Sequence, residues 1–326
     1  MSEVISSKKI LITGCSGFVG RQLVDSLLKT SEVDFACATS KFDPQTPKSI
    51  AVGRIGSNSD WRKALESVSH VIHLAGRAHV MQDKPEDLKL YKEVNLVGTL
   101  RLAEQAAVAG VKRMVFISTI KVCGDGSLTP QKYGYQETDI SQHLNNDPYA
   151  LSKHEAETGL LKIAQDTNLE ICILRPPLVY GPGVKGNLLS LSRAIRRGFP
   201  LPFSYAKNNE RSMVSVFNLI DAILTVLHHP NAKNETFNIA DADAVSTKVL
   251  IELIAEAMNV APKLVPIPKE LFRVAAAVTG KSPLYARLFG NLKVDTRKIS
   301  KELGWSPPRT LREDLHRAFA VNGGVD

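Results

Sequence analysis

The sequence has little of what marks secreted, metal-binding or membrane-spanning proteins. Only four of its 326 residues are cysteines, and no two of them form a C-x-x-C pair. Because disulfide frameworks and zinc sites need paired or clustered cysteines, we expect reduced thiols packed as small apolar groups at Cys15, Cys37, Cys123 and Cys172. No apolar run is long enough to cross a bilayer, and Lys8-Lys9-Ile10 leads directly into a strand pattern. We therefore expect a cytoplasmic protein with no stable membrane insertion.

Positive charge is in excess, but no nucleic-acid-binding module accompanies it. The chain has 41 Lys and Arg against 33 Asp and Glu, a formal net charge of +8. Basic and acidic residues are interspersed, and the densest basic stretch, 273–301, is broken by apolar positions. We expect solvated helix faces, or else a field that attracts phosphorylated small molecules, and no nucleic-acid partner.

The first half of the chain alternates short β-branched runs with amphipathic segments, which is typical of parallel β-α-β winding. The predicted strands are residues 9–13, 33–39, 70–74, 113–118 and 170–174. Helices are predicted after the glycine-rich segment that follows the first strand, from Asp60, from about Pro85 to Gly110, and from Asp147. The last has Asp147 as its N-cap and Pro148 at its first position.

Beyond residue 176 this alternation loosens, and proline and glycine separate shorter elements. We therefore predict two parts. Residues 1–176 form a nucleotide-binding domain, whose sheet also receives two strands from about 212–240, near 214–216 and 236–239. Residues 177–211 and 241–326 form a smaller substrate-binding lobe.

A glycine-rich turn between the first strand and the first helix predicts a dinucleotide site. Gly14, Gly17 and Gly20 have the spacing G-x-x-G-x-x-G. The first two glycines allow a tight turn and a close approach of a pyrophosphate, and the third allows the helix to pack against the sheet. The helix N-terminus offers free N–H groups. The predicted fold class is therefore α/β, a Rossmann-type doubly wound parallel sheet with a smaller, interleaved C-terminal lobe.

The end of the second strand bears on the choice of cofactor. An acidic residue there would bind the 2′-hydroxyl of NAD, whereas a basic one suits the 2′-phosphate of NADP. The sequence has Thr39-Ser40-Lys41, and Asp43 lies past the expected position. This pattern favours NADP(H) over NAD(H), with a solvated loop charge at Lys41 as the alternative.

Four polar residues suggest proton transfer. Tyr149 and Lys153 are four residues apart and so share one helix face. A nearby ammonium lowers the pKa of a phenol, which lets the tyrosine exchange a proton with a substrate oxygen. Ser118 and Thr119 end the preceding strand, where a hydroxyl can hold that oxygen. The alternative is an exposed helical pair with no chemistry.

Together these features resemble the extended short-chain dehydrogenase/reductases, which include sugar-nucleotide epimerases, dehydratases and 4-ketoreductases. Further matching segments run across nearly the whole chain: His73-Leu74-Ala75-Gly76, Asn95-Leu96-Val97-Gly98-Thr99, residues 175–183 and residues 303–307. Gly76 and Arg77 depart from the family, because they replace a common pair of alanines near the cofactor phosphates.

The resemblance implies roles for individual residues. Thr119, Tyr149 and Lys153 correspond to the catalytic residues, and Lys153 also holds the nicotinamide ribose. Asn95 corresponds to a structural asparagine. The implied cofactor-binding residues are Gly14, Ser16, Gly17, Phe18, Val19, Gly20, Lys41, Leu74, Ala75, Asn95, Lys153 and Pro176. The implied substrate-binding residues are Asn187, Leu188, Leu201, Phe203, Arg211 and Arg287; for Leu201 and Phe203 a plain core role is the alternative.

Within the family, the chain is most similar to bacterial enzymes of O-antigen and capsule synthesis. These act at C4 of a UDP-hexose or UDP-hexosamine, as 4-epimerases or as 4-ketoreductases of the UDP-N-acetylquinovosamine type. The lack of an acid beside Lys41 favours the reductase. The resemblance also implies a homodimer. A reductase of a non-sugar ketone and a non-catalytic NADP-sensing regulator stay open as alternatives; Asn187 and Arg211 argue against the first, and Tyr149 against the second.

Overall fold

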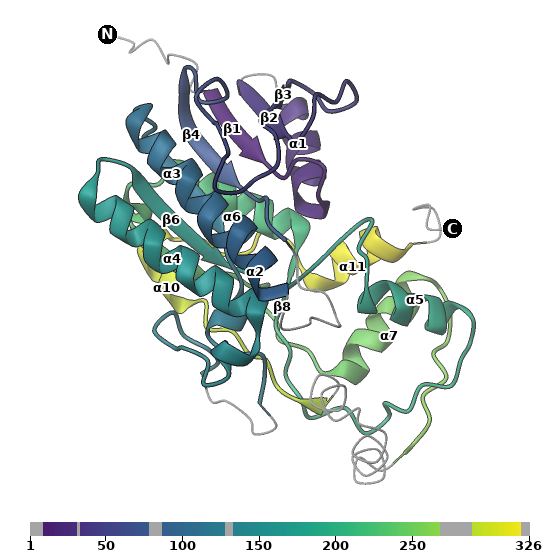
Figure 1. Cartoon of the computed structure of the whole chain (residues 1–326). Coiled ribbons are helices and arrows are strands. Elements are labelled where there is room, and N and C mark those ends of the chain that lie inside the picture. The colour runs from purple at the N-terminus through teal and green to yellow at the C-terminus, as the bar shows by residue number, and fades with distance from the viewer. Residues whose placement is uncertain (1–8, 31–32, 78–86, 128–132, 268–288, 321–326) are drawn as a thin grey trace.

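A seven-stranded parallel sheet forms the centre of the molecule (Figure 1). The computed structural model describes residues 9–30, 33–77, 87–127, 133–267 and 289–320. The strands of the sheet are β1 (Lys9–Thr13), β2 (Phe35–Thr39), β3 (Ser49–Ala51), β4 (Val68–His73), β5 (Arg113–Ile117), β6 (Glu170–Arg175) and β9 (Glu235–Asn238). They lie in the order β3-β2-β1-β4-β5-β6-β9, and every neighbouring pair is parallel. The predicted doubly wound sheet is confirmed.

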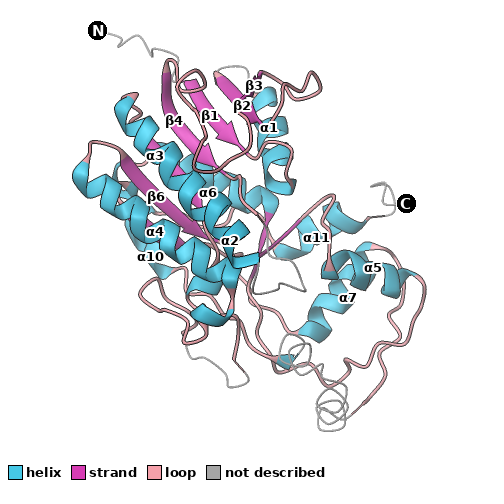
Figure 2. Ribbon diagram, viewed as in Figure 1, coloured by secondary structure: helices cyan, strands magenta, loops and turns pink. Residues whose placement is uncertain are grey.

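Helices cover both faces of this sheet (Figure 2). They are α1 (Phe18–Lys29), α3 (Gly98–Val108), α4 (Pro148–Asp166), α6 (Val216–His228) and α10 (Arg297–Leu303). α1, α6 and α10 share one apolar core with strand residues such as Ile12. α3 and α4 share a second core with Leu11 and its neighbours on the opposite face. Because the strands are buried on both sides, they read as nearly continuous apolar runs in the sequence.

The long helix expected from Pro85 to Gly110 is one helical run with a π-helical section. Its described part comprises α2 (Asp87–Tyr91), the π-helix η1 (Lys92–Val97) and α3. Pro85 itself lies outside the described residues. The π-helical section carries Asn95, and such sections are often found at functional sites.

The prediction of a helix from Asp60 is wrong, because the chain makes only turns between Asp60 and β4. Asp60 Oδ1 accepts a hydrogen bond from the Arg62 N–H at 3.1 Å, two residues on, which is the geometry of an Asx turn. Ser67 then has a φ of 59°, a left-handed conformation that ends the turn, and β4 begins at the next residue.

The C-terminal lobe has its own small sheet and core. Its elements are β7 (Leu178–Tyr180), α5 (Asn187–Arg196), β8 (Met213–Ser215), α7 (Thr247–Ala257) and α11 (Leu311–Phe319). The strand expected near 214–216 does not join the central sheet: β8 pairs in parallel with β7 instead. The place beside β6 is taken by β9, whose Glu235 lies opposite Cys172. Only the second of the two late strands expected in the sheet is therefore confirmed.

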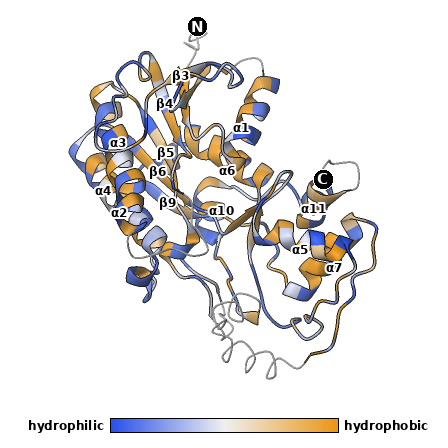
Figure 3. Ribbon diagram, turned by 45° about the vertical axis from the view of Figure 1, so that its right-hand side comes forward, coloured by the Kyte–Doolittle hydropathy of each residue, from blue (hydrophilic) through white to orange (hydrophobic). Residues whose placement is uncertain are grey.

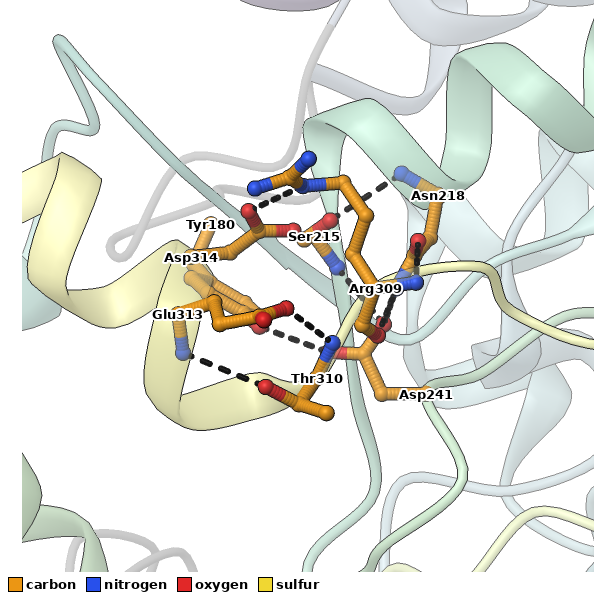
Figure 4. Close-up of polar contacts among 8 residues, drawn as sticks. All are labelled: Tyr180, Ser215, Asn218, Asp241, Arg309, Thr310, Glu313 and Asp314. Atoms are coloured by element: carbon orange, nitrogen blue, oxygen red, sulfur yellow. Dashed lines mark hydrogen bonds and ion pairs between the residues drawn. The ribbon is translucent and has the colours of Figure 1, made fainter.

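A buried polar network joins this small sheet to α11 (Figure 4). The Tyr180 hydroxyl donates to Asp241 Oδ2 at 2.7 Å, and the Asn218 amide donates to Asp241 Oδ1 at 2.7 Å. Arg309 Nε donates to Asp314 Oδ1 at 2.5 Å, and Asn218 also donates to the Arg309 carbonyl. Burial raises the pKa of the Asp241 carboxyl. These bonds hold the start of α11 against the small sheet of β7 and β8.

Hydrophobic residues are concentrated on the strands and on the helix faces that cover them, as the colouring of the ribbon shows (Figure 3). All four cysteines are free and buried, as expected. Within the part of the chain that is described, no helix is long and apolar enough to span a membrane. The carboxyl ends of β1, β4, β5 and β6 share one edge of the sheet, which brings together the segments that follow them.

The remaining short helices are η2 (Ile120–Val122), η3 (Leu144–Asn146) and η4 (Pro230–Ala232). η2 and η3 lie on the path from β5 to α4, and η4 connects α6 to β9. The first of them follows Thr119 directly, so its position decides where that hydroxyl lies.

Candidate active site

The glycine turn has the geometry that a pyrophosphate requires. Gly14 has a φ of 75°, and a Cβ there would lie 2.7 Å from the Ala75 nitrogen. A Cβ on Gly20 would lie 2.1 Å from the Gly14 oxygen, so the first turn of α1 packs directly on the glycine turn. Ser16 and Gly17 are exposed, and no side chain among the described residues caps α1. The N–H groups of this helix end are therefore available to an anion.

The end of β2 lacks a free carboxylate. Lys41 is exposed. Asp43 accepts hydrogen bonds from the Gln45 N–H at 3.0 Å and the Thr46 hydroxyl at 2.6 Å. These bonds lower the pKa of Asp43, with the Thr46 hydroxyl contributing most. Asp43 therefore stabilises its own turn, and the exposed Lys41 is the charged residue next to the end of β2.

Asn95 connects the loop after β4 to the helix of Tyr149. Its Oδ1 accepts from the Arg77 N–H at 2.7 Å, and its Nδ2 donates to the Arg77 carbonyl and to Ser152 Oγ, both at 3.1 Å. The Ala75 N–H in the same loop donates to Thr13 Oγ1 at 3.1 Å. With its amide used in this way, Asn95 has the structural position that the family resemblance implied, and Leu74 and Ala75 border Gly14.

Thr119 lies two residues after the end of β5 and serves as the N-cap of η2, where its Oγ1 accepts from the Lys121 N–H at 3.3 Å. The Ile120 N–H donates to the Pro176 carbonyl at 3.0 Å, which ties this loop to the end of β6. Ser118 Oγ is buried and has no hydrogen-bond partner among the described residues. A buried hydroxyl with no partner beside the glycine-rich edge fits the polar groups of a bound nucleotide.

Tyr149 is the second residue of α4, and Asp147 caps this helix by accepting from the Ala150 N–H at 3.0 Å, as predicted. Burial raises the pKa of Tyr149 to about 12, although the hydrogen bond with Thr119 lowers it in part. The expected lowering of this pKa by the lysine is not found, because in the free protein desolvation of the phenolate dominates. The Tyr91 ring lies edge-on to Tyr149, with 6.0 Å between centroids.

Lys153 lies one helical turn further on and is buried. Its Nζ donates to the Ile117 carbonyl at 2.7 Å and lies 4.3 Å from the centroid of the Phe116 ring. Burial lowers the pKa of Lys153 to about 8, and Glu157 acts in the opposite direction. A Cβ on Gly76 would lie 3.5 Å from Nζ, so the glycine leaves room beside the ammonium. The structure therefore brings Thr119, Tyr149 and Lys153 together at the end of β5.

Of the expected substrate residues, those that the structure describes lie in the C-terminal lobe. Asn187 is exposed at the start of α5, whereas Leu188, Leu201 and Phe203 are buried in the core of the lobe, which favours the plain core role for the last two. Arg211 pairs through its backbone with Val245, and its guanidinium donates to the Gly290 carbonyl at 3.3 Å. Arg287 lies outside the described residues. Contacts of these side chains with a substrate stay predictions.

The model for the NAD dependent epimerase/dehydratase family matches residues 10–240 of this chain. The chain belongs to this family. One relative of this chain is the UDP-glucose 4-epimerase of Vibrio cholerae. The two are 42% identical over 308 residues, which cover 94% of this chain and 93% of the relative. The match confirms the family resemblance seen in the sequence.

Solved structures of similar proteins agree with this assignment. MoeE5 in complex with UDP-glucose and NAD is 25% identical, with a TM-score of 0.73, and the match covers 95% of this chain and 97% of that protein. The UDP-glucuronic acid 4-epimerase from Bacillus cereus in complex with NAD has a TM-score of 0.74 at 21% identity and covers 95% of each chain. At 21% identity, the likeness to the enzyme from Bacillus cereus supports the fold alone.

A buried histidine at the end of β4 lies close to these residues, and the sequence did not reveal its role. His73 Nδ1 lies 2.7 Å from Thr13 Oγ1, and its Nε2 lies 2.9 Å from Thr99 Oγ1. Burial, with the charge of Lys153, lowers the pKa of His73 to about 3, so the ring is neutral. Thr13 accepts from Ala75 and can donate to Nδ1, which leaves the Nε2 proton for Thr99. The position of His73 in the His73-Leu74-Ala75-Gly76 motif was the available signal.

Proposed function

We propose that this chain is a nicotinamide-dependent 4-epimerase of a UDP-sugar. The observation that carries the proposal is the convergence of Thr119, Tyr149 and Lys153 at the end of β5, on the same sheet edge as the glycine turn. The relative from Vibrio cholerae, a UDP-glucose 4-epimerase at 42% identity, supports the choice of reaction. MoeE5, bound to UDP-glucose and NAD, supports the choice of ligands.

The residues divide the chemistry among themselves. A bound nicotinamide supplies the site for taking a hydride from C4 and returning it. With the positive charges of Lys153 and of a bound oxidised nicotinamide favouring its phenolate, Tyr149 would take the proton of the C4 hydroxyl and later return it to the same oxygen. Thr119 holds the same oxygen through its hydroxyl. Lys153 keeps a positive charge beneath the site, because it is still protonated at neutral pH with a pKa of about 8.

The fit of the cofactor rests on the glycine turn and the groups around it. Ser16, Gly17, Phe18 and Val19 would surround the pyrophosphate, and Lys41 would lie at the adenosine ribose. Because Asp43 is used within its own turn, the end of β2 favours NADP(H), whereas MoeE5 holds NAD. Titration of each dinucleotide against the protein and its Lys41→Ala variant tests this choice: only NADP(H) affinity should fall in the variant.

The charge pattern at the end of β2 favours a second candidate, a one-way 4-ketoreductase that consumes NADPH. A reductase needs a cofactor that dissociates after each turnover, and Lys41 with no competing acid suits the 2′-phosphate of NADPH. The homodimer, the cytoplasmic location and the supply of sugars for surface polysaccharide stay predictions alongside either reaction.

The deciding experiment is a panel of UDP-hexoses and UDP-N-acetylhexosamines incubated with the purified protein and followed by proton NMR. We expect formation of the 4-epimer without net change in nicotinamide absorbance. The Tyr149→Phe variant should be at least about a hundredfold slower, since proton transfer by a positioned side chain contributes this much. Stoichiometric loss of NADPH on a UDP-4-keto-sugar would establish the reductase, and inactivity on every sugar nucleotide would refute both.

A further inference from the structure

An ion pair joins the loop that carries Thr119 to the helix that carries Tyr149. Lys121 Nζ donates to Asp147 Oδ2 at 2.6 Å. The other carboxylate oxygen, Asp147 Oδ1, accepts from the Ala150 N–H at 3.0 Å and so caps α4. Lys121 is two residues after Thr119, and Asp147 is two residues before Tyr149.

This pair differs from an ordinary surface ion pair. Each of its side chains is only 21% exposed, so about four-fifths of each is covered by protein. A fully exposed pair contributes little and is screened by salt. Lys121 and Asp147 are partly desolvated, and the Asp147 carboxylate is already fixed by its helix cap, so the pair holds a defined geometry at lower entropic cost.

We propose that Lys121 is a positioning residue for proton transfer, which acts through Asp147 to hold the Thr119 hydroxyl against the Tyr149 hydroxyl. The proposal rests on the proposed function, because it concerns the same proton. Thr119 and Tyr149 come from separate elements, β5 with its following η2, and α4. The backbone bond from Ile120 to the Pro176 carbonyl anchors η2 to β6 and leaves its distance from α4 to be set by side chains.

The ion pair also affects the charge that Tyr149 experiences. After burial, which is the main cause, the negative charge of Asp147 further raises the pKa of Tyr149. The Lys121 ammonium lies on the same carboxylate and offsets that charge. Among the described residues, the other titratable or charged groups on this side of the sheet edge are Tyr91 from α2, Arg77 stacked on the Tyr91 ring, and Lys153 with Glu157 from α4.

The two halves of the pair therefore have opposite electrostatic effects. Removing Lys121 leaves Asp147 unopposed and should raise the pKa of Tyr149. Replacing Asp147 with asparagine keeps an acceptor that can cap α4 but removes the charge, and should lower it. A merely structural role predicts no such opposition, because both variants would then impair the enzyme in the same way.

The test is the pH profile of kcat on the best UDP-sugar of the panel, for Lys121→Met, Lys121→Arg and Asp147→Asn. We expect Lys121→Met to lower kcat about tenfold through lost orientation, with KM changed less than about twofold. Its acidic limb should move to higher pH by roughly half a unit, and that of Asp147→Asn to lower pH by a similar amount. Lys121→Arg should restore most of kcat, because guanidinium also binds carboxylate.

The matched control is Lys92→Met. Lys92 Nζ donates to Glu155 at 2.7 Å, so this ion pair also links α4 to a neighbouring element, with side chains 38% and 30% exposed. It is remote in sequence from Thr119, and the variant should keep the profile of the wild type. Equal effects of Lys121→Met and Lys92→Met, or limbs that shift in the same direction in Lys121→Met and Asp147→Asn, would overturn the proposal.

A second readout separates this proposal from the proposed function. Proteins labelled with ¹³Cζ-tyrosine and saturated with dinucleotide report the Tyr149 titration directly, with Tyr149→Phe identifying the signal. The opposite shifts in Lys121→Met and Asp147→Asn should appear there even if no UDP-sugar is turned over. A normal epimerase with no such shifts would contradict the role of Lys121 alone, and shifts without turnover would contradict the proposed function alone.

Discussion

Replacing Lys153 with methionine should stabilise the free protein while abolishing turnover. Lys153 is 5% exposed, and burial lowers its pKa from 10.5 to about 8. At pH 7 the ammonium is charged in both the folded and the unfolded chain, so the fold bears the full cost of burying it. At 1.36 kcal/mol per pH unit this cost is about 3 kcal/mol.

Part of this gain is lost with the side chain. Lys153 Nζ donates to the Ile117 carbonyl at 2.7 Å, and methionine cannot replace that donor. Leaving the Ile117 carbonyl without this hydrogen bond lowers the stability of the variant by about 1 kcal/mol. We therefore expect Lys153→Met to raise the free energy of unfolding by about 2 kcal/mol at pH 7, the net of these two effects.

The pH dependence gives the sharper test. Between about pH 8 and 10.5 the folded wild type loses this proton while the unfolded chain keeps it. The unfolded state then binds more protons, so the free energy of unfolding of the wild type rises with pH. The variant lacks this proton, so its advantage should shrink by about 1.4 kcal/mol per pH unit across that window.

Urea unfolding followed by the fluorescence of Trp61 and Trp305, at intervals from pH 7 to 10, measures this difference. Lys92→Met, which removes a partly exposed lysine, should unfold with the pH dependence of the wild type. If Lys153→Met destabilises the protein at pH 7, or if its difference from the wild type is the same at pH 7 and pH 10, the buried ammonium does not carry the cost assigned to it.

Three further substitutions test the glycine turn and the lobe. Gly20→Ala should cost about 1–3 kcal/mol of stability and weaken dinucleotide binding at least about tenfold, because its Cβ would lie 2.1 Å from the Gly14 oxygen. Thermal melting and fluorescence titration measure the two effects. Gly17→Ala, whose Cβ would lie 3.1 Å from the same oxygen, should lose less stability than Gly20→Ala. Tyr180→Phe should cost about 1–3 kcal/mol by removing the donor to the buried Asp241 carboxyl. An unchanged melting temperature would contradict the role of that network.

Local signals in the sequence were sufficient for the features that depend on neighbouring residues. The apolar run of β1, the glycine spacing and the N-cap of α4 all rest on contacts within a few residues, and each lies where it was expected. The Tyr149 and Lys153 pair followed from helical periodicity. Thr119 was added to them by its place at the end of the preceding strand and by the family resemblance.

Features set by distant contacts could not be read in the same way. β8 has a strand pattern, but it pairs with β7, and β9 lies at the edge of β6 instead. The pKa of Tyr149 is raised mainly by burial, which the hydrogen bond with Thr119 offsets only in part, and burial is a property of the whole fold. The ion pair of Lys121 and Asp147 joins positions 26 residues apart, with no spacing that would predict it.

The central claim is that this chain moves a hydride from C4 of a UDP-sugar and returns it to the same carbon. The most direct measurement follows the best substrate of the panel, labelled with deuterium at C4, by proton and deuterium NMR. The account predicts a 4-epimer that keeps the label at C4, with no net formation of reduced nicotinamide. Loss of the label to free nicotinamide, or recovery of unchanged substrate under conditions where the dinucleotide is bound, would contradict it.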